Sequence, residues 1–267
     1  MWRFYASHIF LRKIFDSKRW YKELRIKLIV AYDGTNYHGW QVQPNGITIE
    51  EVLNKALSDL FESDIKVLGA SRTDAGVHAL GNVAIFDVDS KMEPTRISYA
   101  LNTRIPEDIT VLDSCRVDDD WHPHFVSSVK TYEYRILNRT FQDPLRRLNT
   151  YHYHHKLDVS AMEKAAKYFE GTHDFSAFCS VKAQVKTFER TLYSVNVIKK
   201  EDEIIIRCSG NGFLYNMVRI IAGTLIAVGQ GRIMPEEISD IIKSKDRENA
   251  GPTAPAHGQT LIGIEYR

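Results

Sequence analysis

The stretch GASRTDAGVHALG, residues 69–81, fixes one acid, Asp74, among small residues and two positions after a cation, Arg72. Largely apolar segments flank it at residues 65–68 and 82–88, and the second alternates as one face of a strand does. Asp74 is therefore predicted to lie on a tight loop between two strands, where a rigid scaffold can present one carboxylate to a large substrate. The same run also fits an aspartate that only caps its own turn.

The rest of the chain predicts a mixture of helices and strands. Thr48 and Glu51 have the spacing of a capping box that opens a helix, and Ser160 and Glu163 repeat that spacing. Strand-like segments occur at residues 24–32, 130–138, 192–198, 203–208 and 261–266. This layout predicts an α+β chain with two halves of similar content and a boundary near residues 138–151.

Composition is that of an ordinary soluble globular protein. The chain has 267 residues, 43% of them hydrophobic and 26% charged, and no apolar run reaches the length of a membrane span. Three widely spaced cysteines form no C-x-x-C pair, which argues against a zinc ribbon or a disulfide framework and fits a reducing, cytosol-like compartment. The net charge of +1 is weak support for a polyanionic ligand, so an RNA-binding hypothesis depends on local clusters such as Arg135, Arg139, Arg146 and Arg147.

A buried helix with one charge is the next pattern. Residues 213–228 are apolar nearly all round except for Arg219. An unpaired buried charge costs several kcal/mol, so Arg219 needs a carboxylate partner. A purely structural ion pair, or a side chain that extends to the surface, explains the arginine equally well.

Several aromatic and histidine residues are ambiguous from sequence alone. Tyr132 shares a strand face with Tyr134 and fits core packing as well as a functional role. His152 and His154 share one face of a predicted strand, but no acidic or cysteine partner accompanies them, so no metal site is predicted. The aromatic residues in positions 37–41 fit either core packing or RNA contacts.

The chain resembles the tRNA pseudouridine synthase A family, whose catalytic aspartate lies in an Arg-Thr-Asp-Ala-Gly-Val-His run, here residues 72–78. The resemblance covers residues 24–267, and so many ordered blocks are more specific than one short motif. The other blocks follow in the family's order: AYDGTNYHGWQVQPNG at 31–46, ALNTRIPEDI at 100–109, KTYEYRILN at 130–138, GTHDFSAFCS at 171–180, GNGFLYNMVRIIAGTLIAVGQG at 210–231 and TAPAHGQTL at 253–261.

The resemblance implies an α+β fold of two ferredoxin-like (RRM-like) halves that share a mainly antiparallel sheet, with the active-site cleft between them. We divide the chain into an N-terminal extension, residues 1–23, an N-terminal catalytic half, residues 24–138, and a C-terminal half, residues 139–267. The catalytic half carries Asp74 and Tyr132, and the C-terminal half carries Arg219.

The resemblance also implies an activity, the isomerisation of uridine to pseudouridine at positions 38 to 40 of tRNA, in the anticodon stem-loop. It further implies a homodimer that works in the cytoplasm without a cofactor or a metal. Asp74 would act as nucleophile or as base, and the residues do not choose between the two. Tyr132 would stack on the flipped uracil. Arg219 would pair with Asp74, and we expect that pairing to lower the pKa of the carboxyl.

Three residues of the 72–78 run are expected to bind substrate. Arg72 resembles the arginine that holds the extruded nucleotide, and Thr73 and His78 complete the set. Two alternatives remain open, an RNA-binding module with the same fold but no catalysis, and an aspartate-dependent glycosidase, which would need a second carboxylate.

Two features depart from the family pattern. Gln259 occupies a position where the family usually has leucine, and if that leucine lines the uracil pocket, the glutamine makes the pocket more polar. Residues 1–23 precede the family's usual start and are basic, with many aromatic residues. They fit an amphipathic arm or a misassigned start better than a transit peptide for an organelle.

Overall fold

The chain folds around one large β-sheet in a computed structural model that describes residues 23–180 and 186–267. The strand order is β4-β1-β3-β10-β5-β9-β8-β7, with β2 paired to β3 and β6 paired to β5. All pairs are antiparallel except β10 with β3 and β5 with β6. The strands are β1 (Leu24–Tyr32), β2 (Leu68–Gly69), β3 (His78–Val88), β4 (Ile109–Arg116), β5 (Ser128–Leu137), β6 (Tyr151–His152), β7 (Gly171–Asp174), β8 (Glu189–Lys200), β9 (Glu203–Gly210) and β10 (Gln259–Tyr266).

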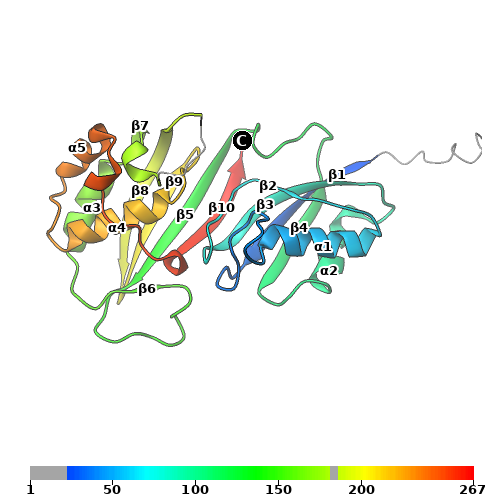
Figure 1. The fold of residues 1–267 in the computed structure, drawn as a ribbon, viewed down its shortest axis with the longest axis horizontal. Coiled ribbons are helices and arrows are strands. Elements are labelled where there is room, and N and C mark those ends of the chain that lie inside the picture. The colour runs from blue at the N-terminus through cyan, green and yellow to red at the C-terminus, as the bar shows by residue number, and fades with distance from the viewer. Residues whose placement is uncertain (1–22, 181–185) are drawn as a thin grey trace, which may run out of the picture.

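The last strand of the chain joins the two parts of the sheet. In Figure 1, β10 lies beside β5 at the centre, with β1 to β4 on one side and β7 to β9 on the other. Thr260 of β10 pairs with His78 of β3, and Leu261 pairs with Tyr132 of β5. The predicted α+β class with a mainly antiparallel sheet is confirmed. The division at residue 138 stays a prediction, and the proposed extension, apart from Glu23, lies outside the described residues.

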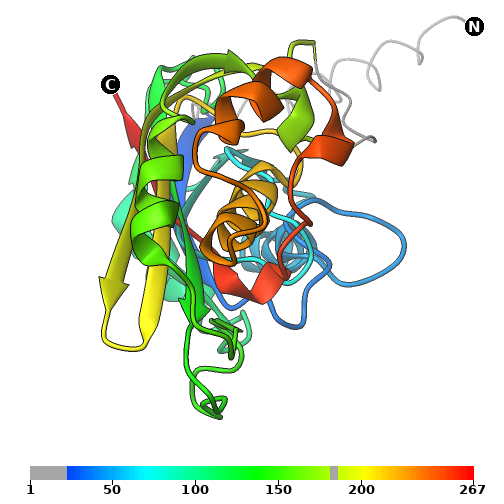
Figure 2. The ribbon, with the colours of Figure 1, turned by 90° about the vertical axis from the view of Figure 1, so that its left-hand side faces the viewer.

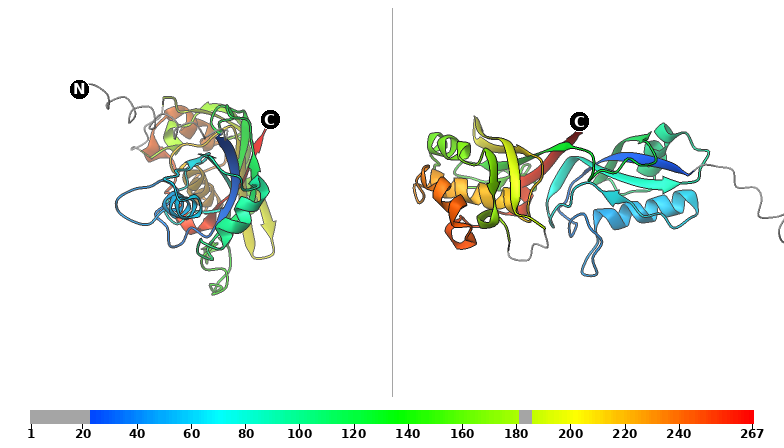
Figure 3. Two further views of the ribbon diagram at one scale, coloured as in Figure 1. Left: turned by 90° about the vertical axis from the view of Figure 1, so that its right-hand side faces the viewer. Right: turned by 90° about the horizontal axis from the view of Figure 1, so that it is seen from above.

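Helices pack on the sheet to form two adjoining cores. They are α1 (Ile49–Phe61), α2 (Ile97–Asn102), α3 (Val159–Lys167), α4 (Met217–Gly229) and α5 (Glu237–Ser244). Short 3₁₀ turns occur at Pro94–Arg96, Ser176–Phe178, Arg247–Asn249 and Ala256–Gly258. The end-on view of Figure 2 shows α1 and α4 on the same side of the sheet, and both views of Figure 3 show α1 beside β1 and β3.

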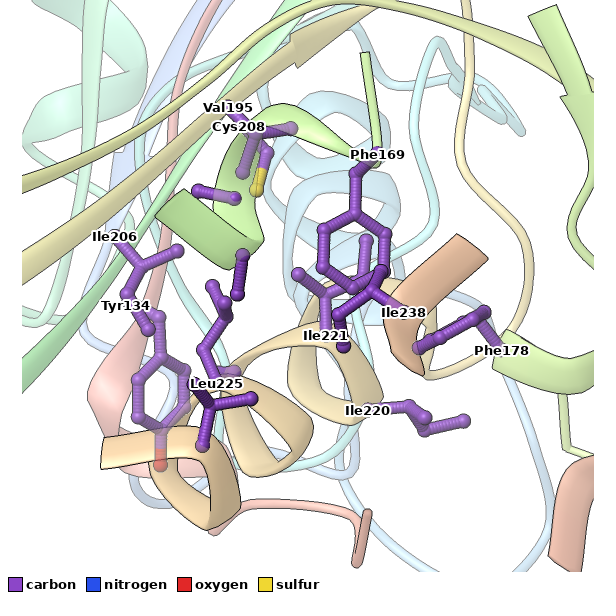
Figure 4. Packing of buried hydrophobic residues seen from close by; sticks show 14 of the residues in the cluster. Tyr134, Phe169, Phe178, Val195, Ile206, Cys208, Ile220, Ile221, Leu225 and Ile238 are labelled. Atoms are coloured by element: carbon purple, nitrogen blue, oxygen red, sulfur yellow. The ribbon is translucent and has the colours of Figure 1, made fainter. Parts of the chain in front are cut away.

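Each core combines one long helix with the inward face of its strands. Leu53 and Leu57 of α1 pack with apolar side chains of β1 and β3. Leu225 of α4 packs with residues of β5, β8 and β9, among them Tyr134 (Figure 4). Every residue of α4 except Arg219 is buried, as its apolar sequence predicts.

Two helix starts test the patterns read from the sequence. The predicted cap of α1 is confirmed, because Thr48 accepts a hydrogen bond from the backbone N–H of Glu51 at 3.3 Å. The predicted cap of α3 is wrong: Asp158, not Ser160, accepts from the N–H of Ala161, at 3.0 Å. An aspartate two positions earlier offers a charged acceptor to the same free N–H groups.

Helix α4 begins at Met217, four residues after the predicted start. Asn216 adopts a left-handed backbone with φ 61°, which cannot continue a right-handed helix. Residues 213–216 therefore form a loop ahead of the helix. The strand predicted around His152 and His154 is shorter than expected and contains only Tyr151–His152. The choice between core packing and RNA contact for the aromatic residues at 37–41 is also resolved, because Tyr37 and Trp40 belong to the core.

The corrected cap of α3 gives a direct stability test. Asp158→Ala removes the acceptor for an N-terminal N–H of the helix and should lower the free energy of unfolding by about 1 kcal/mol. Ser160→Ala is the matched control, because this exposed side chain caps nothing in the structure and its change should stay within about 0.5 kcal/mol. Urea unfolding of both variants measures the difference, and a larger loss for Ser160→Ala would restore the capping box.

Candidate active site

A cleft opens where the loop after β2 meets the start of α4. It has a volume of about 500 Å³, within the usual range for small-molecule sites. Its walls come from residues 70–74, from β5, from residues 213–218, and from the first residue of β10. Residues far apart in sequence therefore meet at one place, and Asp74 and Tyr132 are among them.

The loop that carries Asp74 is held by the segment before α1. The N–H of Trp40 donates to the carbonyl of Thr73 at 3.1 Å, and the N–H of Gly76 donates to the carbonyl of Tyr37 at 3.2 Å. Gly39, with φ 87°, allows this approach, since a Cβ there would lie 2.5 Å from the Thr73 carbonyl oxygen. The backbone on either side of Asp74 is thus fixed by main-chain bonds.

Buried side chains hold the same loop from the sheet. Asn82 is fully buried and donates to the carbonyl of Ser71 at 2.9 Å. The hydroxyls of Tyr32 and Thr73 lie 2.8 Å apart. A loop restrained by this many bonds keeps the Asp74 carboxylate in one place before any substrate binds.

Lys130 and His124 brace the loop from the other side of the cleft, and neither was predicted from the sequence as a site residue. The ammonium of Lys130 donates to the carbonyl of Ala70 at 2.7 Å, and Nε2 of His124 lies 3.0 Å from the carbonyl oxygen of Gly69. Burial lowers the pKa of Lys130 to about 8. Alternation along β5 puts Lys130 on the face of Tyr132, which was the available signal, whereas nothing in the sequence marks His124.

Arg219 reaches Asp74 from the first turn of α4. Its Nη1 lies 3.6 Å from Oδ2 of Asp74, which is an ion pair longer than a hydrogen bond. Its other bonds orient the guanidinium, with Nε donating to the carbonyl of Ala254 at 2.7 Å and Nη1 donating to Oδ1 of Asn216 at 2.8 Å. The structure brings the predicted pair together, and the catalytic role of the pair stays a prediction.

The electrostatics of Asp74 differ from what the sequence predicts. Its side chain is 24% exposed and that of Arg219 is 18% exposed. Burial raises the pKa of the Asp74 carboxyl, and the Arg219 guanidinium opposes that shift without reversing it. The lowering predicted for the pairing is present, but burial outweighs it in the net direction of the pKa. Desolvation outweighs a cation that sits 3.6 Å away without a short hydrogen bond.

Tyr132 forms the floor of the cleft. Its hydroxyl lies 2.8 Å from Oγ of Ser71, and its ring meets Phe213 edge to face with centroids 5.0 Å apart. Burial raises the pKa of the phenol to about 12, so the group stays neutral at physiological pH. Tyr134, on the same strand face, donates instead to the carbonyl of Pro255 inside the C-terminal core.

The predicted substrate-binding residues separate into three environments. Arg72 is exposed and lines the cleft, and Thr73 lines it with its hydroxyl bonded to Tyr32. His78 lies outside the cleft, at the start of β3. Its Nδ1 lies 3.1 Å from the backbone nitrogen of Gly34 and 3.0 Å from Oδ1 of Asp33, and its Nε2 lies 3.2 Å from the carbonyl oxygen of His257. The imidazole of His78 thus connects loops of the protein.

The arginine cluster on which an RNA-binding hypothesis depends is partly paired within the protein. Arg135 lies 2.8 Å from Glu133, and Arg139 and Arg146 lie 3.1 Å and 2.9 Å from Asp202. Three of the four arginines in the cluster are therefore engaged by carboxylates of the protein. No helix in the described ranges is both long and apolar enough to cross a membrane. Within residues 23–180 and 186–267, no group of three histidine, cysteine or acidic side chains could hold a metal ion.

Comparisons with known proteins point to one family. A family model described as tRNA pseudouridine synthase matches residues 28–126 and 165–267. A tRNA pseudouridine synthase A of Acetivibrio thermocellus is 49% identical over 242 residues, which cover 90% of this chain and 99% of that protein. Proteins of the same name from a Thermoanaerobacter species and from Ruminiclostridium cellulolyticum are 48% and 49% identical, covering 90% and 91% of this chain and 99% of each relative.

The raised pKa of Asp74 predicts how stability depends on pH. An aspartate in the unfolded chain has a pKa of about 4, and the pKa of Asp74 in the folded protein is higher. Between these two pKa values only the folded protein keeps the proton, so the free energy of unfolding falls as pH rises through that interval. Asp74→Asn should therefore gain stability relative to wild type over the same interval and keep the gain at neutral pH. Arg219→Met should extend the interval upward, because it removes the cation. Unfolding free energies measured from pH 4 to 8 test this, and parallel curves for wild type and Asp74→Asn would contradict it.

Proposed function

The chain belongs to the tRNA pseudouridine synthase family, and on that premise we propose that it isomerises uridines at positions 38 to 40, in the anticodon stem-loop of tRNA. It is an isomerase that makes pseudouridine in tRNA. The family resemblance of the blocks around Asp74, Tyr132 and Arg219 supports the choice of the anticodon arm.

A single carboxylate that shares the cleft with a buried tyrosine is the observation that carries the chemistry. Among the described residues that line the cleft, Asp74 is the one acid. Pseudouridine formation breaks the bond from N1 of uracil to the ribose, turns the base, forms a bond from C5, and moves the C5 proton off the base while N1 gains one. Atoms and electrons balance without an oxidant or a group donor. A glycosidase would normally need two catalytic carboxylates.

Asp74 serves this reaction as nucleophile or as base. Its raised pKa makes the ionised carboxylate a stronger base than an ordinary aspartate, and the Arg219 cation keeps the ionised form accessible. In either role the carboxylate must point at the ribose or the base, and the restrained loop supplies that direction.

The target nucleotide must leave the RNA stack to reach Asp74. Extrusion costs a few kcal/mol, which stacking on an aromatic ring can offset in part. We place the uracil on Tyr132 and the extruded nucleotide against Arg72, the exposed cation at the cleft. Thr73 supports the loop, and His78 acts through the loops it joins.

The family resemblance supports three further assignments. Two subunits would hold one tRNA as a homodimer, the protein would work in the cytoplasm without a cofactor, and the halves would divide near residue 138. Most of the affinity for tRNA would come from phosphate contacts, which neutralise charge without reading sequence.

Asp74→Asn tests both the residue and the reaction. The amide is nearly the same size but can neither attack nor accept a proton, so product formation should be lost while the Kd for tRNA stays within about threefold. Pseudouridine is mapped in unmodified tRNA after incubation with wild type and with the variant. We expect it at positions 38 to 40 with wild type alone.

Two results would contradict the proposal separately. Turnover by pure Asp74→Asn would remove Asp74 from the chemistry. Pseudouridine formed by wild type only at other tRNA positions would leave the enzyme class intact and overturn the choice of the anticodon arm.

A further inference from the structure

One buried polar atom in the cleft has no partner in the protein. Gln259 is 7% exposed and lines the cleft, and its Oε1 has no hydrogen bond within the described parts of the chain. The other unpartnered buried side-chain atoms there belong to Gln230 and Tyr266, and neither residue lines the cleft. A buried acceptor without a donor is costly, so a native protein that keeps one calls for an explanation.

The sheet register puts Gln259 next to Tyr132. Gln259 pairs with Tyr134 across β10 and β5, and Leu261 pairs with Tyr132. Residues directly opposite or two apart on neighbouring strands share a face, so Gln259 and Tyr132 are diagonal neighbours on the face that lines the cleft. A base lying on the Tyr132 ring would therefore lie within reach of the Gln259 carboxamide.

Three other polar side chains at or beside the cleft are already bonded within the protein. The hydroxyl of Tyr132 is bonded to Ser71, and the ammonium of Lys130 is bonded to Ala70. Arg219 donates to Ala254 and Asn216. Gln259 is thus left as a polar group of the cleft wall whose hydrogen-bonding capacity is not used by the protein.

We propose that Gln259 is a base-recognition residue, whose carboxamide pairs with the edge of uracil formed by O2, N3–H and O4. This inference rests on the proposed uridine chemistry. Oε1 accepts the N3 proton and Nε2 donates to a flanking carbonyl oxygen, as amides pair with complementary base edges elsewhere. The amide can rotate to present either atom, since its two ends are nearly equivalent in shape.

The symmetry of uracil makes this contact useful throughout the reaction. Turning the base about the axis through N3 and C6 brings C5 to the place of N1 and exchanges O2 with O4. The N3–H donor stays on the axis with one carbonyl on each side. The same carboxamide can therefore hold the free base before and after it turns, and it limits drift while the base is detached from the ribose.

Gln259→Leu is the decisive variant, because it removes the amide and fills the site with the residue usual in the family. The single-turnover rate at saturating tRNA, followed as tritium released from C5 of labelled uridine, should fall about tenfold, the ratio that one to two neutral hydrogen bonds provide. The Kd for tRNA should change less than about twofold. The unfolding midpoint should rise, because an unpartnered buried oxygen is lost.

A modified substrate separates recognition from packing. N3-methyluridine at the target position, wherever mapping places it, cannot donate from N3. We expect methylation to slow wild type about tenfold more than it slows Gln259→Leu. Gln259→Met, which keeps the length of the side chain, should behave as Gln259→Leu does and serves if the leucine variant does not fold.

Gln230→Leu is the matched control, since Gln230 also has an unpartnered Oε1 but does not line the cleft. Its rate should stay within about twofold of wild type. A wild-type rate for Gln259→Leu with an unchanged methylation penalty would overturn the proposal, as would an equal loss of rate in Gln230→Leu. If wild type modifies other tRNA positions, the choice of the anticodon arm fails, but the comparison of variants still tests Gln259.

Discussion

The fixed position of the loop from Ala70 to Val77 is the constraint on which the site depends. Backbone bonds from the segment before α1 hold one side of it, and Asn82, Tyr32 and Lys130 hold the other. A carboxylate on a free loop would turn toward water to recover its hydration. Here the loop keeps Asp74 partly buried, and that burial raises its pKa and makes the nearby cation necessary.

Arg219 provides that cation, and its position depends on the place where α4 and residues 252–254 cross. Gly223 of α4 lets residues 252–254 pass so closely that a Cβ there would lie 1.7 Å from the carbonyl oxygen of Pro252. The same segment accepts the hydrogen bond of Arg219 at Ala254 and then leads into β10, where Gln259 enters the cleft. The same crossing therefore orients the Arg219 guanidinium beside Asp74 and leads the chain to Gln259, the proposed contact to the base.

Local patterns predicted those parts of the molecule that short-range physics decides. Alternation and apolar content located the main strands, the Thr48 cap and the buried helix, and the cost of a buried charge predicted a carboxylate partner for Arg219. The sequence predicted that Arg219 lowers the pKa of Asp74 but not that burial raises it by more, because burial depends on how much protein surrounds the carboxyl. Neither the left-handed Asn216 that delays α4 nor the lack of a partner for Gln259 can be read from spacing.

The most direct test compares two glycines with similar backbones and different surroundings. Gly39 and Gly231 both have positive φ, 87° and 73°, but only at Gly39 does a Cβ meet the Asp74 loop, since nothing lies within 4 Å of a Cβ at Gly231. Single-turnover pseudouridine formation is measured for Gly39→Ala and Gly231→Ala below both unfolding midpoints. If the added Cβ of Gly39→Ala displaces the loop, its rate should lie about 100-fold below that of wild type. The rate of Gly231→Ala should stay close to that of wild type. Equal rates for the two variants would contradict a loop held in place for catalysis.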